Sequence, residues 1–260
     1  MERLKTANYL QKRIIYSLFN EEWYNSMKLF KIIMNYKLGN KYEMSPILKH
    51  MISPDSIVLD IGANMGQYAC RFNNLVKKGS GHVYSFEPVQ ANYTSLKSMK
   101  SKLHLNHVTI NQLGVSNTIT ETTINIPLFN NGLVVGTRAS LLQMENIKHK
   151  TEKIKVTTID SFIAENNIQK VDFIKCDTEG NESNVLEGGK KTIERFLPML
   201  SFEMSYKSES TTWLKNIGYE MYYYNEKADK LTKISDHQTG NLVLINSIKV
   251  ANFSSIIQND

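Results

Sequence analysis

Residues 57–66, which read I-V-L-D-I-G-A-N-M-G, constrain the fold of this chain more than any other stretch. The isoleucines, valine and leucine around Asp60 form the apolar run that is typical of a strand buried on both faces of a parallel sheet. Gly62 and Gly66 indicate a tight turn from this strand into a helix. The pattern predicts an α/β fold with a binding turn at the carboxyl end of its first strand.

Asp60 places a negative charge at this turn, and the charge distinguishes between two kinds of cofactor. A dinucleotide fold holds a pyrophosphate over the turn and has a third glycine where Asn64 stands. S-adenosylmethionine carries an ammonium and a sulfonium, and opposite unit charges about 4 Å apart attract by roughly 4 kcal/mol at an effective dielectric constant near 20. We therefore expect S-adenosylmethionine rather than NAD. A glycine turn that binds no ligand is the alternative.

The composition sets the class of protein. A chain of 260 residues with 41% hydrophobic content can bury a full α/β core and carry an appendage. It has no apolar run long enough for a membrane span and no signal-type segment, so we expect a cytoplasmic protein. Cys70 and Cys176 lie outside any paired metal motif, which fits a reduced compartment. The net charge of +6 comes from dispersed lysines, so we expect no nucleic-acid partner.

Residues 3–37 carry apolar side chains at helical spacing and predict two amphipathic helices. The second helix has an apolar stripe formed by Trp23, Met27, Phe30, Ile33 and Met34. We interpret the stripe as packing against the core, because apolar stripes on helices are usually buried. A substrate lid or the surface of a homodimer is the alternative.

Two further features fit an adenosine. The next predicted strand, residues 82–86, ends at Glu87. An acidic side chain at this place, about 20 residues or more beyond the glycine turn, can accept hydrogen bonds from both ribose hydroxyls. The predicted strand over residues 107–115 contains Gly114, where the backbone can approach an adenine ring.

Residues 127–153 break the periodicity and contain turn signals, so we expect an inserted loop that recognises the substrate. The strands predicted over residues 219–224 and 242–245 lie too close in sequence for a parallel crossover. The sheet is therefore expected to be mostly parallel with one antiparallel edge strand. We assign residues 1–44 to an N-terminal helical appendage and residues 45–260 to the cofactor-binding domain.

A later predicted strand, residues 171–176, is followed by D-T-E-G, which begins at Asp177. Open parallel sheets bind ligands outside the carboxyl ends of their strands. Asp177 and Glu179 are therefore expected on the same edge of the sheet as Asp60 and Glu87.

Taken together, these motifs resemble the FkbM family of S-adenosylmethionine-dependent methyltransferases, within the class I Rossmann-like superfamily. The matching segments are D-I-G-A-N-M-G-Q-Y at 60–68, F-E-P at 86–88, T-T-I-D-S-F at 157–162, I-K-C-D-T-E-G-N-E at 174–182, V-L-E-G-G at 185–189 and the strand ending at Glu203. The resemblance extends over residues 42–247, and Cys176 stands where the family usually has an aliphatic residue.

The resemblance implies a seven-stranded sheet in the order 3-2-1-4-5-7-6 and methyl transfer to a hydroxyl of a sugar, glycan or small metabolite. By position, it places Asp60, Gly62 and Asn64 at the methionine portion of the cofactor and Glu87 at the ribose. Asp177 falls at the methionine ammonium or the reacting centre.

The same glycine motif places Ala63, Gly66 and Tyr68 in the cofactor site.

Methyl transfer to a hydroxyl requires positioning and the removal of a proton. We expect Glu179 to act as the base, with Asp177 as cofactor anchor and Glu203 as the second choice of base. His149 is an alternative. No metal ligands are expected. Competing interpretations are a nucleic-acid amino-methyltransferase, a metal-dependent sugar-nucleotide transferase that uses the Asp177–Glu179 segment, and a binding protein without turnover.

Overall fold

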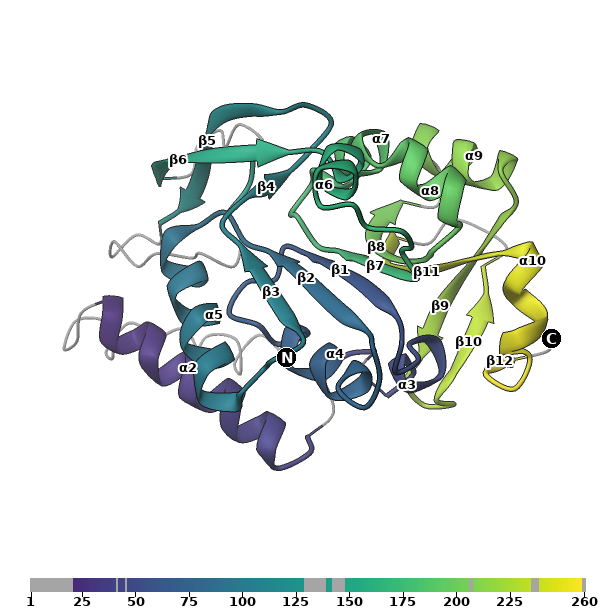
Figure 1. The fold of residues 1–260 in the computed structure, drawn as a ribbon, viewed down its shortest axis with the longest axis horizontal. Helices are drawn as coiled ribbons and strands as arrows, with labels where there is room; N and C mark the ends of the chain where they lie inside the picture. Colours follow the sequence, from purple (N-terminus) through teal and green to yellow (C-terminus); the bar gives the residue numbers. More distant parts are fainter. Residues whose placement is uncertain are drawn as a thin grey trace.

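A computed structural model of the chain describes residues 21–40, 42–44, 46–128, 139–141, 148–205, 208–234 and 239–258 (Figure 1). The first of the two predicted N-terminal helices lies outside these residues. The second corresponds to α2 (Glu21–Lys37). In the part of the chain that the structure describes, no helix is both long and apolar enough to cross a bilayer.

The main sheet has nine strands among the described residues, in the order β12-β10-β9-β11-β8-β7-β1-β2-β3. Five neighbouring strands run parallel. They are β3 (Val108–Asn111), β2 (His82–Phe86), β1 (Ile57–Ile61), β7 (Phe173–Cys176) and β8 (Met199–Ser205). Their carboxyl ends therefore lie on one edge, as expected for a sheet that binds ligands there.

Seven of these strands, β3-β2-β1-β7-β8-β11-β9, follow the expected order 3-2-1-4-5-7-6, and the sheet differs from the expectation in two added strands and in the place of its reversed strand. The reversed strand β11 (Thr239–Asn246) lies inside the sheet, antiparallel to both β8 and β9 (Tyr219–Asn225). Two strands extend the edge beyond β9: β10 (Lys230–Lys233), which pairs antiparallel with β9, and β12 (Ile257–Gln258), which pairs parallel with β10. The strand β10 was not predicted because only Leu231 of its four residues is buried, so its sequence lacks the apolar pattern of a strand. Asn225 Oδ1 closes the turn before it by accepting hydrogen bonds from two backbone N–H groups.

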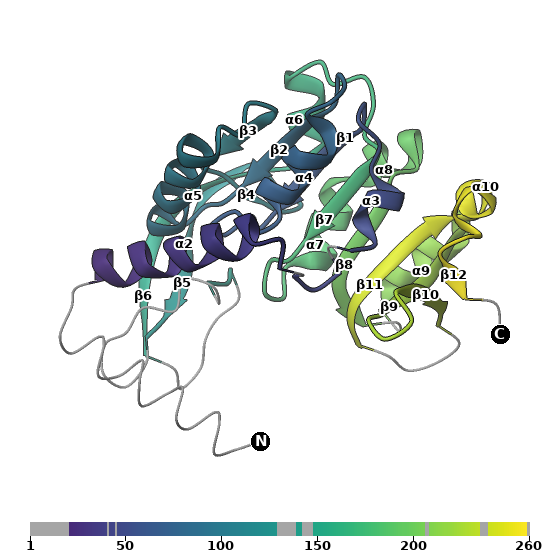
Figure 2. The same ribbon diagram turned by 90° about the horizontal axis from the view of Figure 1, so that it is seen from below.

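Helices cover both faces of this sheet (Figures 1 and 2). Those on one face are α2, α3 (Leu48–Met51), α4 (Ala69–Val76) and α5 (Gln90–Leu103). Those on the other are α6 (Ile159–Glu165), α7 (Glu182–Gly188), α8 (Lys190–Phe196) and α9 (Glu209–Asn216). The short α10 (Ser247–Val250) and the 3-10 helix η2 (Ala251–Phe253) lead into β12.

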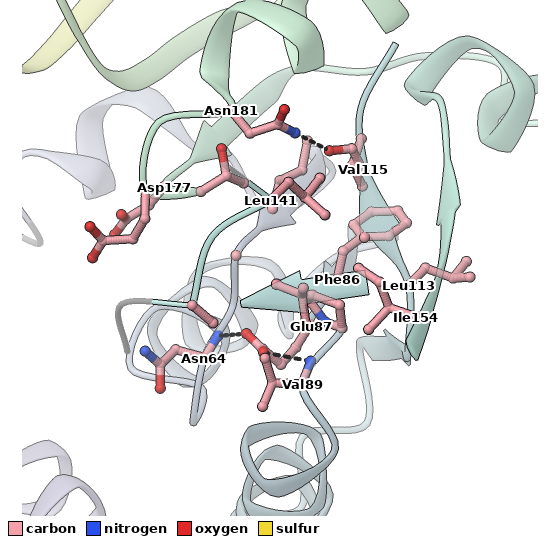
Figure 3. Close-up of a pocket in the computed structure, with 18 residues that line it drawn as sticks. Asn64, Phe86, Glu87, Val89, Leu113, Val115, Leu141, Ile154, Asp177 and Asn181 are labelled. Atoms are coloured by element: carbon pink, nitrogen blue, oxygen red, sulfur yellow. Dashed lines mark hydrogen bonds between the residues drawn. The ribbon is translucent and has the colours of Figure 1, made fainter. Parts of the chain in front are cut away.

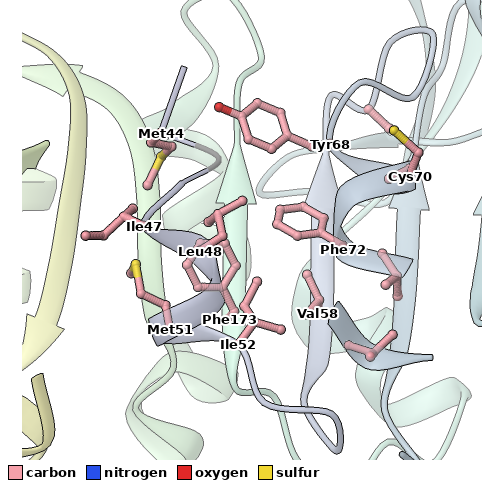
Figure 4. Packing of buried hydrophobic residues seen from close by; sticks show 14 of the residues in the cluster. Met44, Ile47, Leu48, Met51, Ile52, Val58, Tyr68, Cys70, Phe72 and Phe173 are labelled. Atoms are coloured by element: carbon pink, nitrogen blue, oxygen red, sulfur yellow. The ribbon is translucent and has the colours of Figure 1, made fainter. Parts of the chain in front are cut away.

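Alternation along the central strands divides the core into two layers. Val58 of β1 packs with Phe72 and Phe173 beneath α3 and α4 (Figure 4). The next residue, Leu59, belongs to the opposite cluster with Phe162 of α6. Both layers are fully buried, which explains why these strands read as continuous apolar runs.

A second, three-stranded sheet lies beside the main one, in the order β4-β6-β5. Its strands are β4 (Gly114–Val115), β5 (Thr120–Pro127) and β6 (His149–Thr157). The predicted loop over residues 127–153 is therefore wrong at its carboxyl end, because residues 149–153 pair with β5 across the hairpin. The first half of β6 was not predicted as a strand because it is rich in lysine, and the buried residues of β6 lie in its second half.

Candidate active site

The turn after β1 brings two backbones together at the carboxyl edge of the sheet. Gly62 has φ of +77°, and a Cβ at this position would lie 1.9 Å from the carbonyl oxygen of Asp177. Only glycine fits such an approach. Asn64 also adopts a left-handed backbone, with φ of +51°. The glycine predicted from the sequence is therefore required by contact with the turn after β7 as well as by its own backbone angle.

Glu87 follows β2 and is the polar centre of the cleft (Figure 3). Its carboxylate accepts hydrogen bonds from the backbone N–H of Asn64 at 2.8 Å and of Val89 at 3.0 Å, and from Asn92 Nδ2 at 3.2 Å. Burial raises the pKa of Glu87 to about 7, although these three donors oppose the shift. The side chain thus connects the glycine turn to the second strand.

Asp60 is fully buried and does not line the cleft. Ser85 Oγ donates a hydrogen bond of 3.3 Å to Asp60 Oδ2, while Oδ1 has no protein partner. Burial raises the pKa of Asp60 to about 6, and the nearby charge of Lys175 acts in the opposite direction. A buried carboxylate oxygen without a donor is costly, so this atom is available to a donor that the protein itself does not supply.

Lys175, which was not predicted from the sequence, lies behind the cleft and contacts the cleft residue Asp177. It lies in β7 beside Asp60, its side chain is 6% exposed, and its Nζ is 3.2 Å from Asp177 Oδ2. The same Nζ lies 4.7 Å from the ring centroid of Tyr68. A single lysine in a strand that is otherwise apolar, two residues before a predicted anchor, was the available signal.

Tyr68, predicted to contact the cofactor, is buried and lies outside the cleft lining. Its ring stacks on Phe72, and its hydroxyl donates a hydrogen bond of 2.7 Å to Glu43 Oε2. Burial raises the pKa of this hydroxyl. Its position at the start of α4 turns the side chain toward the helices, away from the cleft.

Glu182, the first residue of α7, holds the turn that follows β7. Glu182 Oε1 accepts hydrogen bonds from the backbone N–H and hydroxyl of Thr178 and from the N–H of Gly180. This arrangement gives Glu179 a left-handed backbone with φ of +53° and an exposed position. Ser140 Oγ donates a hydrogen bond of 2.8 Å to the Glu179 carbonyl.

One wall of the cleft is apolar and comes largely from the small sheet and the residues beside it. The apolar side chains that line the cleft are Ile61, Phe86, Val89, Leu113, Val115, Ile124, Ala139, Leu141 and Ile154. Asn181 Nδ2 fixes the backbone there by donating to the Val115 carbonyl at 2.9 Å (Figure 3). A wall of this kind suits a flat ring such as adenine.

The structure separates the predicted site residues into two groups. Those that line the cleft are Gly62, Asn64, Glu87, Gly114, Asp177 and Glu179. Those that do not are Asp60, Ala63, Gly66, Tyr68 and Glu203.

Glu203 lies in β8 with an exposed side chain. Partial loss of solvent around its carboxylate and the negative charge of Asp177 raise its pKa. His149 opens β6 opposite Pro127 and lies outside the cleft lining. Among the described residues, no three of His, Cys, Asp and Glu are grouped so that they could hold a metal ion.

The donor and acceptor set fits an adenosine cofactor with a cationic end. Glu87 offers a buried carboxylate at the cleft, Gly114 lies within an apolar wall, and Asp177 lies across from the glycine turn. The unpartnered Oδ1 of Asp60 adds a further acceptor near that turn. A pyrophosphate, by contrast, would meet carboxylates in this region.

A mixed α/β sheet with helices on both faces and carboxylates near the carboxyl ends of β1, β2 and β7 is a Rossmann-like arrangement, in which ligands bind at that edge of the sheet. The sequence model of the family described as "Methyltransferase FkbM domain" matches residues 60–229. The match spans well over half of the chain, so the chain belongs to the FkbM methyltransferase family. The predicted resemblance is confirmed, and with it S-adenosylmethionine as the cofactor of the family.

Solved structures with a similar fold have low sequence identity to this chain. A methyltransferase FkbM from Methylobacillus flagellatus has 18% identity and a TM-score of 0.47, over 75% of this chain and 44% of its own. An S-adenosylmethionine-dependent O-methyltransferase from Thermotoga maritima has 13% identity and a TM-score of 0.42, over 84% of this chain and 70% of its own.

A fibrillarin from Aeropyrum pernix, with natively bound S-adenosylmethionine, has 11% identity and a TM-score of 0.44, over 77% of this chain and 72% of its own. The chain spans less than half of the length of the Methylobacillus protein. A search of curated proteins gave no match.

Proposed function

We propose that this chain binds S-adenosylmethionine in the cleft and transfers its methyl group to a hydroxyl of a sugar, glycan or small metabolite. The observation that carries the proposal is the position of Glu87. Its buried carboxylate lines the cleft between the glycine turn and an apolar wall. This combination suits ribose hydroxyls next to an adenine ring.

Other residues would hold the remaining parts of the cofactor. Gly114 and the apolar wall would contact the adenine, and Glu87 would accept hydrogen bonds from the ribose. Asp177, at the end of β7, would attract the ammonium of the methionine portion. Asp60 supports that end from beneath the turn, because it is buried and one of its carboxylate oxygens has no protein partner.

When bound, the cofactor supplies a methyl group attached to a positively charged sulfur. The chain has to position an acceptor hydroxyl beside the cleft and remove its proton. Glu179 is suited to this step because it lines the cleft, is exposed and follows Asp177 by two residues. The acceptor O–H bond breaks, the proton passes to a Glu179 carboxylate oxygen, and the electron pair stays on the acceptor oxygen. Glu203 remains the second choice.

The proposal has a direct test in two stages. Calorimetry with S-adenosylmethionine, S-adenosylhomocysteine, NAD and a sugar nucleotide should give binding of the first two only. A screen of sugars, glycans and small alcohols with a radiolabelled methyl donor should then identify a methylated product. Binding of the cofactor with no transfer to any acceptor would favour a binding protein, and binding of NAD would contradict the cofactor assignment.

A further inference from the structure

The apolar stripe predicted on the second N-terminal helix is partly exposed. Phe30 is 59% exposed, Met27 47%, and Met34 and Trp23 37% each. Leu38, one residue beyond the helix, continues the line and is 69% exposed. The expectation that this stripe packs against the core is therefore wrong for these residues.

The core contact of α2 comes from a different side of the helix. Leu29 and Ile33 are buried and join the cluster that contains Leu96 and Met99 of α5. Both views show α2 alongside α5 at one side of the molecule (Figures 1 and 2). The helix thus has two apolar sides, and the side formed by Leu29 and Ile33 is the one buried in the core.

Lysines lie beside the middle and the end of the exposed stripe, whereas α2 begins with Glu21 and Glu22. Lys31 and Lys37 are exposed on α2. The adjacent α5 contains three lysines and no acidic residue, and its Lys97 and Lys102 are exposed. An apolar line with lysines beside it is the pattern of helices that lie in the interface of an anionic membrane.

The stripe suits a lipid surface better than a second copy of the chain. It is a narrow line along a helix of 17 residues, or about 25 Å. Five partly exposed side chains, each of about 150–250 Å² in full, offer roughly 500 Å² in total, which is below the ~800 Å² per partner of a standard interface.

We propose that the exposed stripe of α2, formed by Trp23, Met27, Phe30, Met34 and Leu38, docks the protein on the surface of an anionic phospholipid membrane. The apolar side chains enter the headgroup region while the neighbouring lysines contact lipid phosphates. This docking is peripheral and does not depend on the cofactor site.

The test is sedimentation of the full-length protein with vesicles. Vesicles of phosphatidylcholine with about one third phosphatidylglycerol should bind the protein, and binding should fall as salt screens the charges. Vesicles of phosphatidylcholine alone should bind at least tenfold less. The double variant Phe30→Ser/Met34→Ser should lose at least tenfold in partitioning, and Lys31→Glu/Lys37→Glu about tenfold.

Matched controls separate this effect from a general loss of surface apolarity. Ile119 and Ile248 are 64% and 71% exposed elsewhere on the molecule. Ile119→Ser/Ile248→Ser should bind vesicles as the parent does, and all variants should keep the parent's circular dichroism and melting temperature. Undiminished binding by the Phe30→Ser/Met34→Ser variant would overturn the proposal. So would a lipid-independent dimer that this variant abolishes, since the stripe would then cover a second copy.

Discussion

The backbone N–H of Asn64 donates a hydrogen bond of 2.8 Å to the carboxylate of Glu87 and so joins the turn after β1 to the end of β2. Val89 and Asn92 donate to the same carboxylate. Glu87 is therefore part of the scaffold of the cleft as well as its lining. Any substitution of Glu87 must be assessed by both ligand affinity and stability.

Replacing Glu87 with Ala should weaken S-adenosylmethionine and S-adenosylhomocysteine about tenfold to a hundredfold, or roughly 1.5–3 kcal/mol. The free energy of unfolding should also fall by about 1–3 kcal/mol, because buried N–H groups lose their acceptor. Calorimetry and thermal unfolding measure the two effects. Glu121→Ala, at an exposed carboxylate of β5, should change neither. Unchanged affinity in Glu87→Ala would remove Glu87 from the cofactor site.

The pH dependence of the protein should reflect its two buried carboxylates. Burial raises the pKa of Glu87 from 4.5 to about 7 and that of Asp60 from 3.8 to about 6. Between the ordinary and raised values the folded state binds more protons than the unfolded state, so stability should fall as pH rises from about 4 to about 7. Cofactor affinity should rise over the upper part of this range, as the carboxylates ionise.

Urea unfolding and calorimetry at several pH values between 5 and 8 check both trends. Glu87→Gln cannot titrate, so its stability should depend less steeply on pH than that of the parent. A parent protein whose cofactor affinity is flat from pH 5 to 8 would contradict a role for ionised Glu87.

Local sequence predicted the parts of the site that depend on short segments. The glycine turn and Glu87 could be recognised because a strand, a turn and a helix follow one another along the chain, and their spacing fixes their edge of the sheet. Lys175 was not predicted because its position beside Asp60 depends on the register between β1 and β7, which are far apart in sequence. Tyr68 was assigned to the cleft because position in a motif does not give the direction of a side chain.

The spacing of apolar residues also did not predict two larger features, namely the buried side of α2 and the full length of the β5–β6 hairpin. It identified α2 but could not say which of its two apolar stripes faces the core, since Leu29 and Phe30 fit helical spacing equally. The pairing of residues 149–153 with β5 was not predicted, because the sequence of this segment does not alternate between apolar and polar residues. In both cases the answer depends on tertiary contacts.

Replacing Lys175 with Met should raise the pH at which cofactor affinity is lost on acidification. The lysine charge lowers the pKa of Asp60, so its removal lets this carboxylate protonate earlier as pH falls. Stability should also fall, by less than the ~3–5 kcal/mol of a fully buried pair, because Asp177 is 40% exposed. Lys170→Met, which breaks the exposed pair with Asp172, serves as the control. An unchanged pH midpoint would leave Lys175 a purely structural role.

Replacing Glu179 with Gln should lower the rate of methyl transfer by about a hundredfold or more, while cofactor affinity stays near that of the parent. Gln keeps the shape of the side chain but cannot take the acceptor proton at neutral pH. Single-turnover rates on the acceptor found by screening measure the effect. Glu203→Gln is the comparison, because Glu203 lies outside the cleft lining. A large loss in Glu203→Gln with normal turnover in Glu179→Gln would transfer the role of base to Glu203.

Replacing Gly62 with Ala should destabilise the protein severely, by about 4 kcal/mol or more, because the new methyl group would meet the Asp177 carbonyl at 1.9 Å. Gly39→Ala separates this clash from backbone strain. Gly39 has a similar φ of +70° with no atom within 4 Å of the added Cβ, so it should lose only about 1–2 kcal/mol. Chemical denaturation of both variants measures the difference. Equal losses would mean that the left-handed backbone, and not the contact between the β1 and β7 turns, is what requires glycine at position 62.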